Sequence, residues 1–286
     1  MNAYLALTKP RLLPLVLFSG LPALVMAQGH WPSFRLAAWT LLGTALAGGA
    51  ANALNSYLER DRDAQMERTR TRPLPSGALD PQRALGFGLV LSAVGTLVLW
   101  LAAGPAAALI ALAAILFYVF VYTLWLKPRT PFAVVVGGVS GAIAPLIADA
   151  AIDGHVSAAG WLLFAIIFLW QPPHFYAIAL YRREDYAHAH FPMLHDRIGE
   201  DATRTRIVLW ILALLPVTLA PVALGMLGPA YGAIAGALGL WFLAQAFVLK
   251  QRRDRSSARR TFVVSLAYLV GTFAAMIGDL VWRAFA

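Results

Sequence analysis

Three oxygen-bearing side chains recur at helical spacing where an apolar segment ends. Asn55, Glu59 and Asp63 are four residues apart. On a helix this spacing spreads them over roughly 80° of one face and about 12 Å of rise. Several arginines follow within a few positions, including Arg68 and Arg72. The pattern therefore predicts a surface that holds a divalent cation together with the phosphate oxygens that the metal bridges.

The acidic residues are concentrated in two segments of the chain. Five of the 14 lie in about 59–83 and five more in about 181–204. Acids contribute little to the orientation of a membrane protein, so topology alone leaves the ordered spacing of Asn55, Glu59 and Asp63 unexplained. We expect the two segments to face each other across an opening and to hold Mg²⁺ on a diphosphate.

A diphosphate held in this way is a good leaving group. If the rest of the substrate is an isoprenoid chain, it can lie in the apolar interior while its allylic carbon ionises beside the metal. Arg and Lys side chains then stabilise the charge that develops on the departing phosphates. Aromatic ring faces near the second acidic segment could stabilise an allylic cation. The candidates are Trp170, Phe175, Tyr176 and Tyr181.

The composition is that of an integral membrane protein. Of 286 residues, 60% are hydrophobic and only 13% are charged, and the mean hydropathy is +0.68. Apolar runs recur near the roughly 20 residues that a spanning helix needs. We expect nine spans, at about 11–28, 35–58, 84–103, 105–126, 131–151, 157–180, 205–227, 229–249 and 262–282.

Basic residues predict how the chain sits in the membrane. All Lys and Arg except Arg35 and Arg283 fall on one set of alternate connecting segments, which the positive-inside rule places in the cytoplasm. We therefore expect a cell inner membrane protein with a cytoplasmic N-terminus and the C-terminus on the opposite side. The first apolar run is expected to be retained as a helix rather than cleaved as a signal peptide. The net charge of +9 then reflects topology, and no nucleic-acid partner is expected.

The fold class that follows is all-α. We expect a polytopic membrane protein with nine transmembrane helices around a central cavity, cytoplasmic cap loops, and a single domain over residues 1–286. The chain has no cysteine, which excludes disulfides, iron–sulfur clusters and thiolate zinc sites. Any metal must use oxygen or imidazole ligands.

Short motifs are spread from residue 7 to residue 194. They are Leu7-Thr8-Lys9-Pro10-Arg11, Met66-Glu67-Arg68-Thr69, Arg72-Pro73-Leu74, Tyr122-Thr123, Leu126-Lys127, Trp170-Gln171, Pro173-His174-Phe175, Glu184-Asp185-Tyr186 and Pro192-Met193-Leu194. In these motifs and its two acidic segments the chain resembles the UbiA superfamily of intramembrane prenyltransferases, whose signature is two aspartate-rich motifs on cytoplasmic loops after the second and sixth of nine helices. It is most similar to the branch that acts on haem. The last three apolar runs add only hydropathy.

The resemblance implies transfer of a farnesyl group from farnesyl diphosphate to a vinyl group of haem B, with water adding, to give haem O and diphosphate. Mg²⁺ is the implied cofactor, and haem B is a substrate. A downstream haem-modifying enzyme is a candidate partner, and the lipid bilayer is the surroundings.

The resemblance also assigns roles to individual residues. Asn55, Glu59 and Asp63 match the first motif, with Glu59 where an Asp is usual, and Asp185 matches the last acid of the second motif. The implied metal ligands are Glu59, Asp63 and Asp185. The residues implied to contact substrate are Arg68, Arg72, Lys127, His174 and Tyr181.

His174 has two interpretations. A neutral imidazole is a common iron ligand, so His174 could ligate the haem iron or contact the haem edge. A histidine near a helix end could instead only hydrogen-bond a carbonyl group.

Competing functions come from other classes. Ionisable residues in broken helices also mark transporters, but a transporter site is expected near the bilayer midplane and these acids gather at one rim. A structural subunit would not call for an ordered carboxylate face. Within the enzyme class, the alternative is prenyl transfer to another aromatic, lipid-soluble acceptor of the quinone-precursor type.

Overall fold

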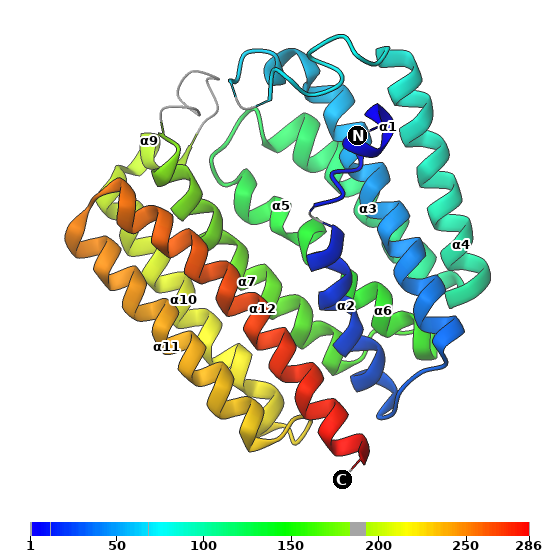
Figure 1. Ribbon diagram of the computed structural model, residues 1–286, viewed down its shortest axis with the longest axis vertical. Coiled ribbons are helices and arrows are strands. Elements are labelled where there is room, and N and C mark those ends of the chain that lie inside the picture. Colours follow the sequence, from blue (N-terminus) through cyan, green and yellow to red (C-terminus); the bar gives the residue numbers. More distant parts are fainter. Residues whose placement is uncertain (1, 12, 68, 184–192, 286) are drawn as a thin grey trace.

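The computed structural model describes residues 2–11, 13–67, 69–183 and 193–285. All regular secondary structure in these ranges is helical, which confirms the all-α expectation (Figure 1). The elements are α1 (Ala3–Leu7), α2 (Leu13–Gln28), α3 (Phe34–Asp63), α4 (Pro81–Leu116), the π-helix η1 (Phe117–Leu126), α5 (Ala133–Gly141), α6 (Ala144–Asp153), α7 (Ala158–Tyr181), α9 (Leu194–Ile198), α10 (Glu200–Ala223), α11 (Pro229–Arg252) and α12 (Arg255–Phe285).

Six helical segments of the described chain are long and apolar enough to cross a membrane. They begin at Pro81, Ala133, Ala158, Glu200, Pro229 and Arg255. The helix α2 is apolar but shorter, and α3 carries several polar residues. A multi-pass membrane protein is therefore supported, whereas nine crossings remain a prediction.

The first of these segments, Pro81–Leu126, has 46 residues, far more than the roughly 20 that span a bilayer. It is interrupted at Gly104, whose φ of 87° and ψ of 169° are not helical, and Pro105 follows. Glycine adopts positive φ without the clash that a Cβ would cause, and proline is well suited to the start of a new helix. The sequence therefore divides the segment here, at the boundary predicted between the third and fourth apolar runs.

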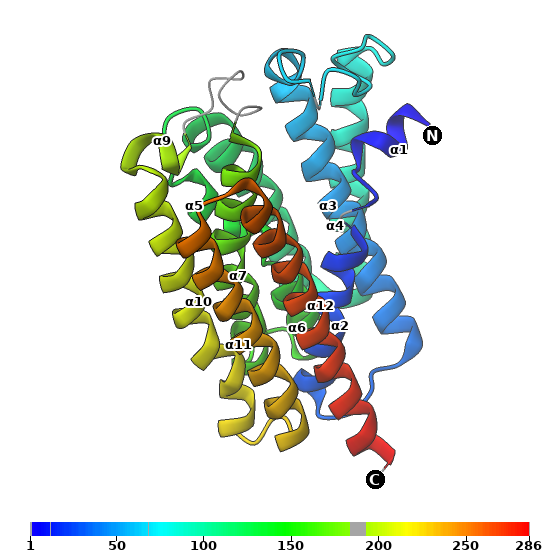
Figure 2. The same cartoon turned by 60° about the vertical axis from the view of Figure 1, so that its left-hand side comes forward.

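The helices lie side by side along the long axis of the molecule, and the two termini are at opposite ends (Figures 1 and 2). The helices α3 and α4 pack together on one side, α7, α10, α11 and α12 form the other, and α2 and α6 lie between them (Figure 2). The main core joins both sides and includes Leu24, Leu99, Ile166 and Phe273. Large apolar side chains such as Leu101 remain exposed, as expected for a surface solvated by lipid.

Small residues set the closest approach of α3 and α4. A Cβ on Gly95 would lie 3.0 Å from the backbone nitrogen of Ala47, and one on Gly43 would lie 2.6 Å from Leu99 Cγ. Such contacts are typical of helix pairs in membranes, where packing replaces the hydrophobic driving force.

Each of the nine predicted apolar ranges lies largely within helical structure, but several boundaries differ. The helix α3 continues to Asp63, five residues beyond the predicted end, so Glu59 and Asp63 lie on the helix. The fifth predicted run is divided into α5 and α6 at residues 142–143. Pro145 at the start of α6 is compatible with a first helical turn.

Candidate functional site

The last turns of α3 carry the three polar side chains singled out by their spacing. Asn55, Glu59 and Asp63 are 2%, 7% and 6% exposed, whereas Asp61 on the same turn has a side chain that is 84% exposed. Burial of two carboxylates costs free energy unless each has a cationic or hydrogen-bonding partner. The segments packed against this face of α3 must therefore supply such partners.

Each buried carboxylate is paired with a cation. Lys127 donates a hydrogen bond to Glu59 Oε2 at 2.7 Å, and Arg72 Nη1 donates to Asp63 Oδ2, also at 2.7 Å. One turn before Glu59, Asn55 Nδ2 donates to Thr123 Oγ1 at 3.2 Å. The structure thus brings together six polar side chains from three segments of the chain.

The spacing of these contacts shows how α3 and η1 run relative to each other. Asn55 meets Thr123 and Glu59 meets Lys127, so a step of four residues along α3 matches a step of four residues along η1. The two segments are therefore parallel. A chain that leaves α3 must reverse twice to return parallel to it, once after Asp63 and once at Gly104.

The π-helical register of η1 aims its polar residues at α3. The backbone N–H of Lys127 donates to the carbonyl of Tyr122, five residues earlier, at 2.9 Å, and Thr123 Oγ1 donates to the carbonyl of Tyr118 at 2.8 Å. A π-helical turn inserts an extra residue and is frequent at functional sites.

The turn after α3 returns Arg72 to Asp63. Thr69 is fully buried, and its hydroxyl donates to the carbonyl of Asp63 at 2.7 Å. Leu74 and Leu79 pack with Leu7 in a small second core. These contacts anchor the turn against α3 and hold the guanidinium of Arg72 beside the carboxylate.

Lys9 also belongs to this cluster, although it was not among the predicted site residues. Its Nζ donates to Asn55 Oδ1 at 3.1 Å, and its backbone has a φ of 53°. The neighbouring Thr8 carbonyl accepts a hydrogen bond from Asn52 Nδ2 at 3.3 Å. The sequence did carry a signal for Lys9, since it is a basic residue inside a family motif and lies shortly before an apolar helix.

The cluster has an excess of positive charge. Among the described residues, Lys9, Arg72 and Lys127 face Glu59 and Asp63. Burial and then the charges of Arg72 and Lys127 lower the pKa of Lys9 to about 8. Burial alone would lower the pKa of Lys127 as well, but Tyr122 and Glu59 raise it above its ordinary value. Three mutually repelling cations favour an anion between them.

The donors suit magnesium but form no complete metal site by themselves. Glu59 and Asp63 offer carboxylate oxygens one turn apart, and Mg²⁺ commonly binds one or two carboxylates together with substrate phosphates. No group of three candidate metal ligands occurs within the described ranges. Asp185 and Arg68 were predicted here, but both lie outside the residues that the structure describes. The expected meeting of the two acidic motifs therefore stays a prediction.

A second set of contacts links η1 to α7 through α5. A Cβ on Gly137 would clash with the ring of Tyr122, so α5 and η1 approach closely. Gln171 Nε2 donates to the carbonyl of Gly138 at 2.8 Å, which ties α7 to α5. The helix α7 continues through Pro172 and Pro173.

His174 lies within α7 and is 7% exposed. Its ring stacks on Trp170, with centroids 4.4 Å apart, and Nδ1 lies 2.7 Å from Ser265 Oγ. Ser265 Oγ donates its single proton to the carbonyl of Phe262 at 2.6 Å. The hydrogen bond to His174 therefore requires a proton on Nδ1, which leaves the lone pair of Nε2 available. That tautomer is the one in which Nε2 can accept a hydrogen bond or ligate a metal.

Tyr181 ends α7 and has other neighbours than the α3 cluster. Its carbonyl accepts a hydrogen bond from Arg255 Nε at 3.1 Å. The guanidinium groups of Arg182 and Arg255 lie 5.5 and 5.3 Å from the centre of its ring. The predicted site residues thus fall into one assembled cluster, at α3, η1 and the turn after α3, and two separate positions on α7.

Comparison with known proteins gives consistent matches over most of the chain. The model of the UbiA prenyltransferase family matches residues 16–275. The chain is 43% identical over 284 residues to protoheme IX farnesyltransferase from Azorhizobium caulinodans, covering 98% of this chain and 92% of that protein. It is 45% identical over 278 residues to protoheme IX farnesyltransferase from Gloeobacter violaceus, covering 96% of this chain and 91% of that protein.

Solved structures match the fold. One described as digeranylgeranylglyceryl phosphate synthase has a TM-score of 0.82 at 16% identity and covers 98% of both chains. A UbiA homologue from Archaeoglobus fulgidus bound to GPP and Mg²⁺ has a TM-score of 0.67 at 17% identity and covers 96% of this chain and all of that one. At these low sequence identities, the similarity shows a shared fold and nothing more.

Proposed function

Because this chain belongs to the UbiA prenyltransferase family, we propose that it transfers a farnesyl group from farnesyl diphosphate to a vinyl group of haem B. The class of enzyme is set by the family. The donor and the acceptor follow from relatives named protoheme IX farnesyltransferase that share more than 40% of their residues with almost the whole chain.

The observation that carries the proposal is the buried cluster of Glu59, Asp63, Arg72 and Lys127. Carboxylates next to a metal and cations next to a phosphate are the two kinds of group that a metal-bound diphosphate needs. Their mutual pairing keeps both kinds desolvated and in place. This explains why acids and bases are gathered at one end of an apolar bundle.

Each residue then has a distinct role. Arg72 and Lys127 turn from the carboxylates to the phosphate oxygens, and Lys9 contributes a third positive charge from the side of Asn55. Glu59 and Asp63, together with Asp185, hold Mg²⁺ by their carboxylate oxygens. Mg²⁺ supplies charge neutralisation to the departing diphosphate. Asn55 positions Lys9 and Thr123 around the first carboxylate.

The reaction is balanced in atoms and charge. The bond between C1 of the farnesyl group and the diphosphate oxygen breaks, and the electron pair leaves with diphosphate. The allylic carbon forms a bond to the terminal carbon of the vinyl group, and water adds a hydroxyl to the other vinyl carbon and releases a proton. Cations around the diphosphate stabilise the charge that develops there.

The same proposal includes the location of the protein in the membrane and its topology. We place the cluster at the cytoplasmic face of the cell inner membrane, with nine crossings, the N-terminus in the cytoplasm and one domain over residues 1–286. The positive-inside distribution supports this orientation. A downstream haem-modifying enzyme is the candidate partner for handing on the product.

An alternative acceptor is an aromatic quinone precursor. The arrangement of His174 favours haem, since the hydrogen bond to Ser265 leaves Nε2 of a neutral imidazole available for iron. A quinone precursor offers no atom that needs such a ligand. Transport is disfavoured because the polar cluster lies where helices end, whereas a transporter site is expected near the midplane.

The experiment is product analysis by mass. Purified full-length protein is incubated with haem B, farnesyl diphosphate and Mg²⁺, and haem O is sought as a mass increase of one farnesyl group plus one hydroxyl group. Absence of haem O from protein that binds farnesyl diphosphate would contradict the acceptor. Prenylation of a quinone precursor in a parallel incubation would then support the alternative.

A further inference from the structure

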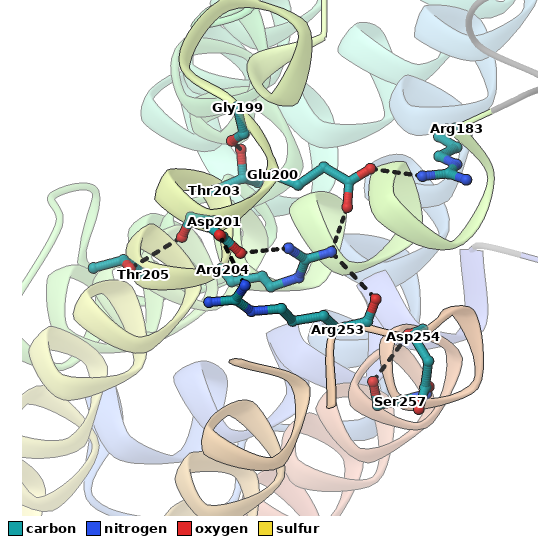
Figure 3. A network of polar contacts seen from close by, with 10 residues as sticks. All are labelled: Arg183, Gly199, Glu200, Asp201, Thr203, Arg204, Thr205, Arg253, Asp254 and Ser257. Atoms are coloured by element: carbon teal, nitrogen blue, oxygen red, sulfur yellow. Dashed lines mark hydrogen bonds and ion pairs between the residues drawn. The ribbon is translucent and has the colours of Figure 1, made fainter. Parts of the chain in front are cut away.

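A second polar region lies at the ends of α7, α10 and α11 (Figure 3), and its lining shares no residue with the α3 cluster. It contains a cavity of about 280 Å³. Its charged lining residues are Arg182, Arg183, Glu200, Arg204, Arg253, Asp254 and Arg255. Apolar side chains at the ends of α7 and α11 complete the wall.

Among the described residues, the basic side chains that line the cavity outnumber the acidic ones. Arg183 pairs with Glu200 at 2.7 Å, and Arg204 pairs with Glu200 and with Asp201. Arg253 lies 3.4 Å from Asp201. Five guanidinium groups line the space against two carboxylates, and Asp201 adds one more acid behind the wall. The described lining therefore favours an anionic ligand.

Arg204 supplies an independent indication of a ligand. The residue is 6% exposed, and its Nε has no hydrogen-bond partner in the part of the chain that the structure describes. Buried polar groups are nearly always paired, and an unpaired donor on a charged group is costly. An acceptor oxygen in the cavity would satisfy it.

Arg255 is held at the same cavity by contacts that do not use all of its N–H donors. Its Nε donates to the carbonyl of Tyr181 and its guanidinium lies over the Tyr181 ring. A guanidinium has five N–H donors in a rigid fork that matches phosphate oxygens. The fixed Arg255 thus presents a preorganised surface for an oxyanion.

The neighbouring surface is suited to a lipid. A second hollow, lined by Phe247, Lys250, Gln251 and Arg253, shares Arg253 with the first. Along α11 from there, Leu240, Trp241 and Phe247 are large exposed apolar residues. A basic cavity at the end of a helix, above an apolar helix face, matches the two parts of a phospholipid.

We propose that this cavity binds the phosphate group of an anionic phospholipid, with the acyl chains along the exposed face of α11. The volume is close to the lower end of the range for small-molecule sites, about 300–1,000 Å³. That size suits a headgroup better than a whole tetrapyrrole. The proposal concerns binding and does not depend on the reaction assigned above.

The test compares two charge-matched double variants of the full-length protein. Arg253→Gln with Arg255→Gln removes two lining charges at exposed positions. Arg259→Gln with Arg260→Gln removes two exposed charges from the next turn of α12, outside the cavity. Arg204 is left intact because its loss would leave Glu200 and Asp201 without their buried partner and threaten folding.

Phosphatidylglycerol binding to each detergent-purified protein is measured by native mass spectrometry, with phosphatidylcholine as the zwitterionic reference. We expect the cavity variant to bind phosphatidylglycerol about 30-fold more weakly, since two basic residues are removed and each one near a lipid phosphate contributes about a factor of five. The α12 variant is expected to stay within about threefold of the unsubstituted protein.

Three results would overturn the proposal. Equal weakening in both variants would mean a diffuse basic surface. Displacement of the lipid by millimolar inorganic phosphate alone would assign the cavity to free phosphate. Displacement of the lipid by haem B would mean that the cavity binds the carboxylates of haem B.

Discussion

Lys127 Nζ donates a hydrogen bond to Glu59 Oε2 across 2.7 Å, and we propose the first residue as a ligand of the diphosphate and the second as a ligand of the metal. A cation meant for phosphate and an acid meant for a metal therefore neutralise each other when neither ligand is present. Arg72 and Asp63 repeat the arrangement. Arrival of a metal-bound diphosphate exchanges one set of ion pairs for another, so both carboxylates keep a cationic partner in both states.

Two variants separate stability from catalysis at this pair. Lys127→Met leaves the buried Glu59 without its cation, and we expect a loss of about 2 kcal/mol in the free energy of unfolding, at the lower end for such pairs because the Lys127 side chain is 25% exposed. Adding Glu59→Gln removes the stranded charge and should restore most of that stability. Activity should stay lost in the double variant.

The measurements are thermal unfolding in detergent and turnover with farnesyl diphosphate. If Lys127→Met were as active as the unsubstituted protein, Lys127 would have no role in holding diphosphate. If the double variant were as unstable as the single one, the coupling between the two side chains would be absent.

Asp63 and Asp61 offer a matched pair of acids for testing the metal. Asp63→Asn should reduce turnover about 100-fold, because removal of one charge-stabilising group at a reacting centre costs about 10²–10³. Asp61→Asn changes the same charge two residues away on an exposed side chain and should stay within about twofold. Turnover is measured across a Mg²⁺ titration, with chelated samples as the zero point. An Asp63→Asn enzyme with an unchanged Mg²⁺ requirement would argue against Asp63 as a ligand.

The α3 side of the cluster could be predicted from the sequence because it rests on local periodicity. Asn55, Glu59 and Asp63 share a helix face, and that face is fixed by spacing alone. Thr123 and Lys9 could not be assigned in the same way. Their contacts to Asn55 span 68 and 46 positions and depend on the π-helical register of η1 and a left-handed residue, neither of which leaves a periodic pattern.

The contact between His174 and Ser265 could not be predicted from the sequence either. Ser265 lies in the last apolar run, where hydropathy was the only feature detected. It meets His174 because α12 packs against α7. The boundary of α3 was missed for a related reason, since hydropathy falls at Glu59 while helical hydrogen bonding continues to Asp63.

The contact between α5 and α7 can be tested with a glycine pair. In Gly141→Ala the new Cβ would lie 2.5 Å from Gln171 Oε1, so we expect a loss of about 1–3 kcal/mol from overpacking and displacement of the Gln171 bond to Gly138. Gly236→Ala on α11 meets no atom within 4 Å and should be neutral or slightly stabilising. Thermal unfolding of both variants checks this. Equal stability of the two would mean that Gln171 moves aside without cost.

Substitution of His174 should weaken binding of the acceptor, haem B, without weakening binding of the donor, farnesyl diphosphate. If Nε2 contacts haem, His174→Ala should raise the KM for haem B about tenfold or more and leave the KM for farnesyl diphosphate unchanged, because His174 lies on α7 and not in the α3 cluster. Ser265→Ala keeps the ring but frees Nδ1 from its partner, so the tautomer is no longer fixed and a smaller effect in the same direction is expected.

The spectroscopic readout is the absorption of bound haem B. Loss of an imidazole ligand changes the Soret band, so His174→Ala should shift it relative to the unsubstituted protein, and added imidazole should reverse the shift. His174→Ala protein with an unshifted band and an unchanged KM for haem B would leave the histidine as a packing residue between Trp170 and Phe262. A shifted band with an unchanged KM would mean that the iron ligand contributes little to affinity, and the role of His174 would then be orientation of the vinyl group.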